Sequence, residues 1–186
     1  MRQNFGKKSW LYPMPVLIVA AYDRNGVPNV MNAAWGGIYT DDMIGICLSE
    51  GHKTTKNIRE TGAFTVSMAT ASCIVSCDYV GIVSGNKEPD KFVKAGFTAE
   101  KSEFVNAPVI AELPMTLECE LVSYDEESNH LVGRIVNVSA DENILTGGKI
   151  DVEKLRPVTY DPVNNRYIEL GAVAGKAFSC GKELKQ

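Results

Sequence analysis

Short apolar segments bounded by turn residues recur along this chain and constrain its fold more than any other feature. Residues 16–22 form an apolar, β-branched run that ends at Asp23-Arg24-Asn25-Gly26, and an Asn-Gly pair is typical of hairpin turns. Residues 28–34 resume an extended pattern, so the two segments predict a β-hairpin. Residues 43–48 and 64–68 predict two further strands. The first half of the chain therefore predicts strands more than helices.

The middle of the chain predicts short helices, and the second half returns to strands. Helices are expected from Thr54 to a stop at Gly62, over 71–80, and from Pro89 to Gly96. Residues 116–124 alternate, with Leu117, Cys119 and Leu121 on one side and acidic residues on the other. We interpret the five acidic residues between positions 118 and 127 as a solvated face. A returning strand over 131–138 and an extended piece within 158–170 complete a mainly β pattern with short helices, which suggests an antiparallel barrel.

Composition fits one soluble domain that spans residues 1–186. The 186 residues are 45% hydrophobic and 23% charged, with a net charge of −4, which argues against nucleic-acid binding. No apolar run is long enough to cross a membrane, and no signal-peptide core follows the polar N-terminus, so we expect a cytoplasmic protein without a membrane partner. Five cysteines without paired spacing predict free thiols and no metal site. A redox role for Cys73 and Cys77, four residues apart, is left open.

The first polar segment that could hold a ligand is Ser49–Ile58. It follows a predicted strand and opens a predicted helix, whose free amides favour an anion. The hydroxyls of Ser49, Thr54 and Thr55 add donors, and Lys53 or Lys56 adds positive charge. A terminal phosphate suits this combination, although plain helix capping with solvated lysines explains the same residues.

Two further segments carry weaker signals. In residues 29–37, small residues beside Trp35 allow a backbone to approach a flat ring closely, but taken alone this segment is better explained by a strand that ends in a glycine turn, with Trp35 in the core. Lys91 lies in the first turn of its predicted helix, where a cation is poorly placed unless an anion is near. The alternative is a solvated lysine that pairs with Asp90 or Glu88. No Ser/His/Asp or Cys/His group predicts a catalytic residue.

Taken together and in this order, these segments resemble the flavin-reductase-like, FMN-binding split-barrel family, and most closely its flavoredoxin-type branch. The resemblance covers nearly the whole chain. Its matching pieces are Asn29–Trp35, Ser49–Ile58, Asp90–Thr98 and Pro114–Cys119. It implies a Greek-key-like split β-barrel, a homodimer, and FMN near the subunit interface.

The resemblance also implies a role for each matching residue. Backbone amides from Asn32 to Ala34 would meet the polar edge of the isoalloxazine ring, and Lys91 and Tyr167 would lie near the flavin. Ser49, Lys53, Thr54 and Thr55 would hold the ribityl chain and the phosphate. The implied cofactor-binding residues are Asn29, Met31, Asn32, Ala33, Ala34, Trp35, Ser49, Lys53, Thr54, Thr55, Lys91 and Tyr167.

Three functions remain open at this point. The first is an FMN-dependent oxidoreductase that uses NAD(P)H to reduce flavin or another small acceptor. The second is an FMN electron carrier between redox protein partners. The third is a barrel module that has lost its cofactor. In the first two, the flavin carries the redox chemistry, which agrees with the lack of a protein nucleophile.

Overall fold

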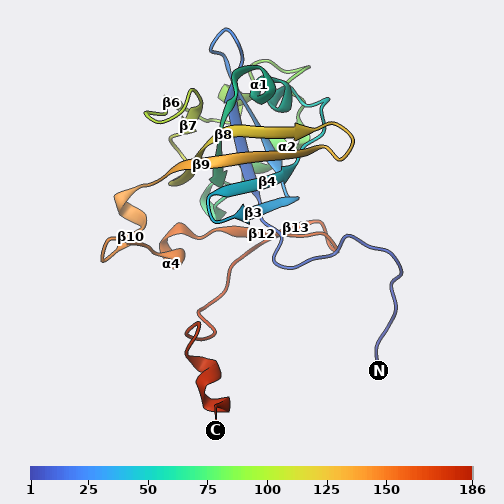
Figure 1. Cartoon of the computed structure of the whole chain (residues 1–186), viewed down its shortest axis with the longest axis vertical. Coiled ribbons are helices and arrows are strands. Elements are labelled where there is room, and N and C mark those ends of the chain that lie inside the picture. The colour runs from blue at the N-terminus through green and yellow to red at the C-terminus, as the bar shows by residue number, and fades with distance from the viewer. Residues whose placement is uncertain (186) are drawn as a thin grey trace.

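A curled antiparallel sheet of seven strands forms the centre of the protein in the computed structural model, which describes residues 1–185 (Figure 1). Neighbouring strands follow the order β2-β1-β5-β8-β9-β4-β3, so β2 and β3 are the two edges. The sheet is thus an open barrel, which confirms the predicted mainly β, antiparallel fold. Its strands are β1 (Leu17–Tyr22), β2 (Pro28–Ala33), β3 (Gly36–Thr40), β4 (Met43–Cys47), β5 (Ala63–Met68), β8 (Met115–Asp125) and β9 (His130–Ala140).

Short helices and two-stranded hairpins surround this sheet. The helices are α1 (Lys53–Thr61), α2 (Ile74–Ile82), α3 (Lys91–Lys94) and α4 (Val152–Leu155), with 3₁₀ turns over Ala71–Cys73, Glu142–Ile144 and Cys180–Leu184. The hairpins are β6 (Ala99–Lys101) with β7 (Pro108–Ile110), β10 (Leu145–Thr146) with β11 (Lys149–Ile150), and β12 (Val158–Asp161) with β13 (Arg166–Glu169). Among residues 1–185, no helix is long and apolar enough to cross a membrane.

Strand β1 is apolar throughout because both of its faces are buried. Leu17, Val19 and Ala21 point into the barrel, where they pack in a core with Phe64. Alternate side chains, including that of Ile18, pack on the other face in a second core beneath α2 and α3. The period of two along a strand thus divides its side chains between two cores. The second core fixes α2 and α3 against the hairpin of β1 and β2.

The interpretation of all five acidic residues between 118 and 127 as a solvated face is wrong for Glu118. Its side chain is buried, and it accepts hydrogen bonds from the hydroxyl of Ser102 and, at 2.7 Å, from the amide of Asn137. The connection between β6 and β7 covers this side of β8. The alternating sequence of β8 predicted one exposed face, but at Glu118 both faces of the strand are covered.

Two features were not predicted from the sequence. Gly36-Gly37, which suggested a turn, instead begins β3, which pairs with β4 from Gly36↔Ile46 onward. The chain also leaves the barrel at both ends. We call residues 1–12 the N-terminal arm and residues 171–185 the C-terminal arm. Figure 1 shows both arms leaving from the side of the barrel where β3, β12 and β13 lie.

Candidate functional site

Two adjoining cavities lie along the open edge of the sheet, beside β2. The first, about 200 Å³, lies between β2, the start of α1 and the loop after α2, and we call it the lysine cavity because Lys91 lines it. The second, about 380 Å³, lies between the end of β2, α2 and the hairpin of β12 and β13; Tyr160 and Tyr167 line it, and we call it the tyrosine cavity. Asn32, Gly81 and Ile82 line both cavities, so the two cavities share one continuous wall.

Two glycines allow the end of α2 and the loop that follows it to approach β2 closely. A Cβ atom on Gly85 would lie 2.4 Å from the side-chain nitrogen of Asn29, and one on Gly81 would lie 3.0 Å from Cβ of Asn32. Asn32 also donates a hydrogen bond of 3.1 Å to the carbonyl of Cys77 in α2. Side chains at either glycine would force the two walls of the lysine cavity apart.

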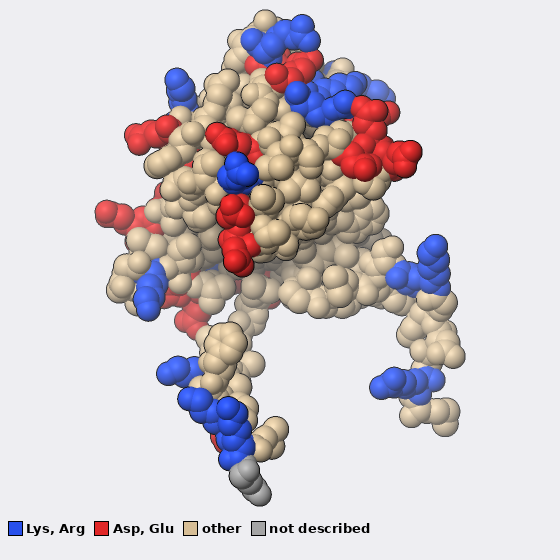
Figure 2. Space-filling model, viewed as in Figure 1, with Lys and Arg blue, Asp and Glu red and all other residues tan. Residues whose placement is uncertain are grey.

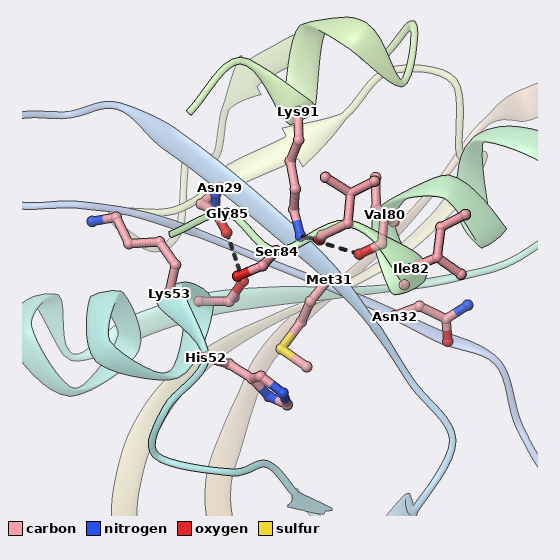
Figure 3. A pocket seen from close by; sticks show the side chains of 13 residues that line it. Asn29, Met31, Asn32, His52, Lys53, Val80, Ile82, Ser84, Gly85 and Lys91 are labelled. Carbon is pink, nitrogen blue, oxygen red and sulfur yellow. Dashed lines mark hydrogen bonds between the residues drawn. The ribbon is translucent and has the colours of Figure 1, made fainter. Parts of the chain in front are cut away.

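Lys91 is the buried cation of this site. Its side chain extends from α3 into the lysine cavity (Figure 3), and the residue is 3% exposed. The ammonium donates hydrogen bonds to the carbonyls of Val80, at 3.1 Å, and Val83, at 2.8 Å. These carbonyls lie at the C-terminal end of α2, which carries partial negative charge. Burial nevertheless lowers the pKa of Lys91 to about 8.

This environment excludes one of the two interpretations of Lys91. The alternative of a solvated lysine paired with Asp90 or Glu88 is wrong, because the side chain is buried and bonds to backbone carbonyls. Lys94, one helical turn later, pairs with Glu88 instead, at 2.7 Å. The poor placement of Lys91 at the start of its own helix is thus compensated by the end of another helix.

The beginning of α1 forms the opposite wall of the lysine cavity. His52 occupies the N-cap position without a capping bond from its side chain, so the first amides of α1 have no side-chain cap. Thr54 donates a hydrogen bond of 2.9 Å to Asn29. Desolvation and, secondly, the positive charge of Lys91 lower the pKa of His52. The uncapped amides and Lys91 give this end of the site an electropositive character suited to an anion.

Lys53 is placed differently from Lys91. Its ammonium turns away from the cavity (Figure 3) and donates a hydrogen bond of 2.7 Å to Asn57, with Asp23 at 3.6 Å. Thr55 lies in the same helical turn, and its hydroxyl is buried without a hydrogen-bond partner among residues 1–185. Lys53 therefore lines the cavity without directing its ammonium into it, and Thr55 lies behind the cavity wall.

The tyrosine cavity combines aromatic faces with one carboxylate. The hydroxyl of Tyr167 donates a hydrogen bond of 2.7 Å to Asp78 in α2. Burial and this contact raise the pKa of Tyr167. Its ring lies near that of Tyr160, with centroids 6.1 Å apart. A flat ligand would find both aromatic surface and hydrogen-bonding groups here.

The structure brings together eight of the twelve residues expected at the site. Asn29, Met31, Asn32, Lys53, Thr54 and Lys91 line the lysine cavity, and Asn32, Ala34 and Tyr167 line the tyrosine cavity. The other four line neither cavity: the side chain of Ala33 faces the barrel core, Thr55 is buried, and Ser49 and Trp35 are exposed.

Several lining residues were not predicted as site residues. They are Val16, His52, Asp78, Tyr160, Asn165 and residues 80–85. The sequence offered a signal for His52, because it lies within the polar segment Ser49–Ile58 that suggested an anion site. Asp78 gave none, since an acidic residue on a short helix is typical of solvated surfaces.

Comparison with known proteins identifies the family. The model of the flavin reductase like domain matches residues 9–162. A solved flavoredoxin of Desulfovibrio vulgaris (Miyazaki F) is 38% identical, with a TM-score of 0.93 over 98% of this chain and 100% of that one. A flavoredoxin from Methanosarcina acetivorans is 29% identical, with a TM-score of 0.89 over 99% of both chains.

More distant matches agree on the fold. An FMN-binding domain of a flavin reductases-like enzyme from Shewanella baltica shares 19% identity, with a TM-score of 0.79 over 87% of this chain and 88% of that one. An uncharacterized protein of Aeropyrum pernix is 28% identical over 153 residues, which cover 81% of this chain but 58% of that longer protein. The chain belongs to the flavin-reductase-like family of FMN-binding split-barrel proteins.

Proposed function

We propose that the two cavities together hold one FMN molecule, and that the protein uses it to carry electrons to or from a redox protein partner. The observation that carries this proposal is the continuous wall along β2, which is electropositive at one end and aromatic at the other. FMN has the matching polarity, with an anionic phosphate and a flat heteroaromatic ring joined by a polar chain.

The lysine cavity suits the phosphate. The uncapped start of α1 offers amide donors, and Lys91 supplies a buried positive charge on the opposite wall. A helix N-terminus and a buried cation that face one cavity stabilise an anion more than either does alone. Lys53, held by Asn57, adds positive charge at longer range. An anion beside Lys91 would also offset the desolvation of its ammonium group.

The tyrosine cavity suits the isoalloxazine ring. Because β2 is an edge strand, alternate backbone N–H and C=O groups along it have no neighbouring strand to bond with. These groups match the polar edge of the ring, as expected for Asn32 to Ala34. Tyr160 and Tyr167 provide aromatic surface, and the exposed Trp35 lies two residues after the end of β2.

When bound, FMN would supply the two-electron redox chemistry, and the protein side chains would bind and orient it. Lys91 and the α1 amides would fix the phosphate end. Asp78 would orient the hydroxyl of Tyr167, and the glycines at 81 and 85 would keep the cavity walls at a fixed spacing. None of these groups needs to form a covalent bond to substrate.

Full-length similarity to flavoredoxins favours a protein electron partner over NAD(P)H. The similarity to the Desulfovibrio vulgaris protein extends over 98% of this chain, well beyond the region matched by the family model. A second candidate, an NAD(P)H-dependent flavin reductase, is favoured by the family model itself. We also propose a homodimer, because the exposed β3 edge carries the apolar side chains of Ile38 and Tyr39 beside Trp35.

The visible spectrum of the purified protein under anaerobic conditions tests these proposals. FMN reconstitution should give a flavin absorption band. Reduced ferredoxin should bleach that band rapidly, whereas NADH and NADPH should bleach it slowly. Rapid bleaching by either nicotinamide would favour the reductase, and failure of every low-potential protein donor would refute the carrier role. A protein that binds no FMN at all would refute both.

A further inference from the structure

The two terminal arms make almost no contact with the barrel from which they extend. Every residue of the N-terminal arm is exposed, and so is every residue of the C-terminal arm except Ser179. Large apolar side chains are among them: Leu11 is 67% exposed, Phe178 101% and Leu184 89%. Apolar side chains gain no stability from such positions, so these arms have the composition of segments that pack against another surface.

Both arms leave the body on one side and border an open space beneath it. Figure 2 shows them as two separate projections below the body, with basic side chains on each. An apolar groove of about 550 Å³ opens on the β3 side of the barrel, lined by Leu17, Ile38, Ile44 and Met115 among others. The face between the arms thus joins the exposed β3 edge to this groove.

The charges of the arms and of this face are complementary. The N-terminal arm carries Arg2, Lys7 and Lys8 and no acidic residue, and the C-terminal arm carries three lysines and one acid. The whole chain has a net charge of −4 although both arms are basic, so the body between them is more acidic than the whole. Asp41 and Asp42 line the groove. Basic arms therefore suit the acidic body of an identical chain.

The arms also begin beside the tyrosine cavity. Tyr12, the last residue of the N-terminal arm, donates a hydrogen bond to Asp161 in β12, and Met14 bonds to Thr159. The C-terminal arm follows β13, which carries Tyr167. A surface that holds the arms would therefore also hold the hairpin that lines this cavity.

The comparisons separate the arms from the family's common domain. The family model ends at residue 162 and begins at residue 9, so the C-terminal arm and most of the N-terminal arm lie outside it. The solved flavoredoxins nevertheless align over 98% and 99% of this chain, which includes both arms. Segments that touch little of their own barrel yet follow a shared path need an external surface to define that path.

We propose that the arms clamp a second copy of this chain, each copy seating its β3 face between the arms of the other. This inference rests on the proposed homodimer and assigns its stability to residues outside the barrel. In a two-fold dimer each contact occurs twice. One self-complementary face with its two arms is therefore sufficient to form the whole dimer interface. A standard interface takes roughly 20–30 residues from each side, and the two arms together are of that size.

Analytical ultracentrifugation of full-length variants tests this proposal. Phe178→Ala should raise the dimer dissociation constant by roughly a hundredfold or more, because two buried phenyl groups are lost per dimer. The matched control is Phe104→Ala, which removes an exposed phenyl group in the connection between β6 and β7 and should leave the constant unchanged. Thermal unfolding of each variant checks that the barrel is intact. Trypsin cleavage after Lys176 and Lys182 should also slow as protein concentration rises through the dissociation constant.

The outcomes are distinguishable. A stable dimer whose strength is the same in Phe178→Ala would overturn the role of the arms and leave the homodimer standing. A full-length chain that stays monomeric would overturn both, whatever its FMN content. Binding of a monomeric chain to phosphatidylglycerol vesicles through its arms would assign them to a lipid surface and refute the second copy as their partner.

Discussion

Lys91 makes a specific prediction about how FMN affinity depends on pH. In the FMN-free protein its pKa is about 8 instead of 10.5, because the ammonium is buried. In the proposed complex the phosphate lies in the same cavity and favours the charged form, so the pKa rises and binding takes up one proton above pH 8. One proton per binding event corresponds to about a tenfold loss of affinity per pH unit. Because half of the free Lys91 is already deprotonated at pH 8, affinity should fall by about 15-fold between pH 8 and pH 9.5.

The variant Lys91→Met removes this proton while keeping an unbranched apolar side chain. We expect its dissociation constant for FMN to be about 10- to 100-fold weaker at pH 7, since a charge-assisted hydrogen bond contributes about 1.5–3 kcal/mol. Above pH 8 its affinity should be nearly independent of pH. Quenching of FMN fluorescence on titration with protein, at constant ionic strength, measures both quantities. The control is Lys94→Met on the same helix, whose lysine pairs with Glu88 outside the cavity.

The pH dependence of the stability of the FMN-free protein provides an independent check. Stability should rise with pH over the range in which FMN affinity falls. Lys91 has a lower pKa in the folded state than in the unfolded state, so the unfolded chain binds more protons between pH 8 and pH 10.5. The contribution of Lys91 to the unfolding free energy should thus rise with pH in this window, by at most about 1.4 kcal/mol per unit. Below pH 8 the full cost of burying the ammonium is present. If wild-type FMN affinity is flat above pH 8, or if Lys91→Met retains the wild-type slope, the phosphate does not lie beside Lys91.

Three further substitutions test the walls of the site and the barrel. Gly85→Ala places a methyl group against Asn29, so FMN affinity should drop at least tenfold. Thermal unfolding should show that the free energy of unfolding falls by about 1–3 kcal/mol. Unchanged FMN binding would show that β2 and the loop after α2 need not be this close. Tyr167→Phe should shift the flavin potential in a redox titration while costing about 1 kcal/mol or less in FMN binding, because only the hydrogen bond to the α2 carboxylate is lost. Glu118→Ala should destabilise the protein by about 2–4 kcal/mol in chemical unfolding, since two buried donors lose their acceptor, whereas the exposed Glu120→Ala should have little effect.

Regular strands were predictable because their pattern repeats within a few residues. The hairpin of β1 and β2 follows from an apolar run and an extended segment on either side of Asn25-Gly26, and both are strands in the structure. β3 was missed because two glycines at its start favour a turn locally. Its pairing with β4, which follows after Asp41 and Asp42, determines its conformation. The arms gave no periodic pattern, so the sequence did not separate them from the barrel.

The residues proposed to hold the phosphate were predictable in outline because many of them follow one another at the start of α1. The aromatic end was predictable only through the family resemblance, because Tyr167 and Asp78 are 89 positions apart. No local pattern joins them. Their contact depends on the hairpin of β12 and β13 returning to α2 after the barrel is complete.

Lys91 shows how a local conflict in a sequence can point to a site without identifying its cause. A cation in the first turn of α3 opposes that helix's dipole, and the conflict suggested a nearby anion. The structure places the carbonyls of Val80 and Val83, at the end of α2, where that anion was expected. They reduce the cost of burial but do not remove it, because the pKa of Lys91 remains well below 10.5. This remaining cost of burying the ammonium is the physical reason to expect a phosphate in the cavity. The opposite pH dependences of FMN affinity and of protein stability measure it directly.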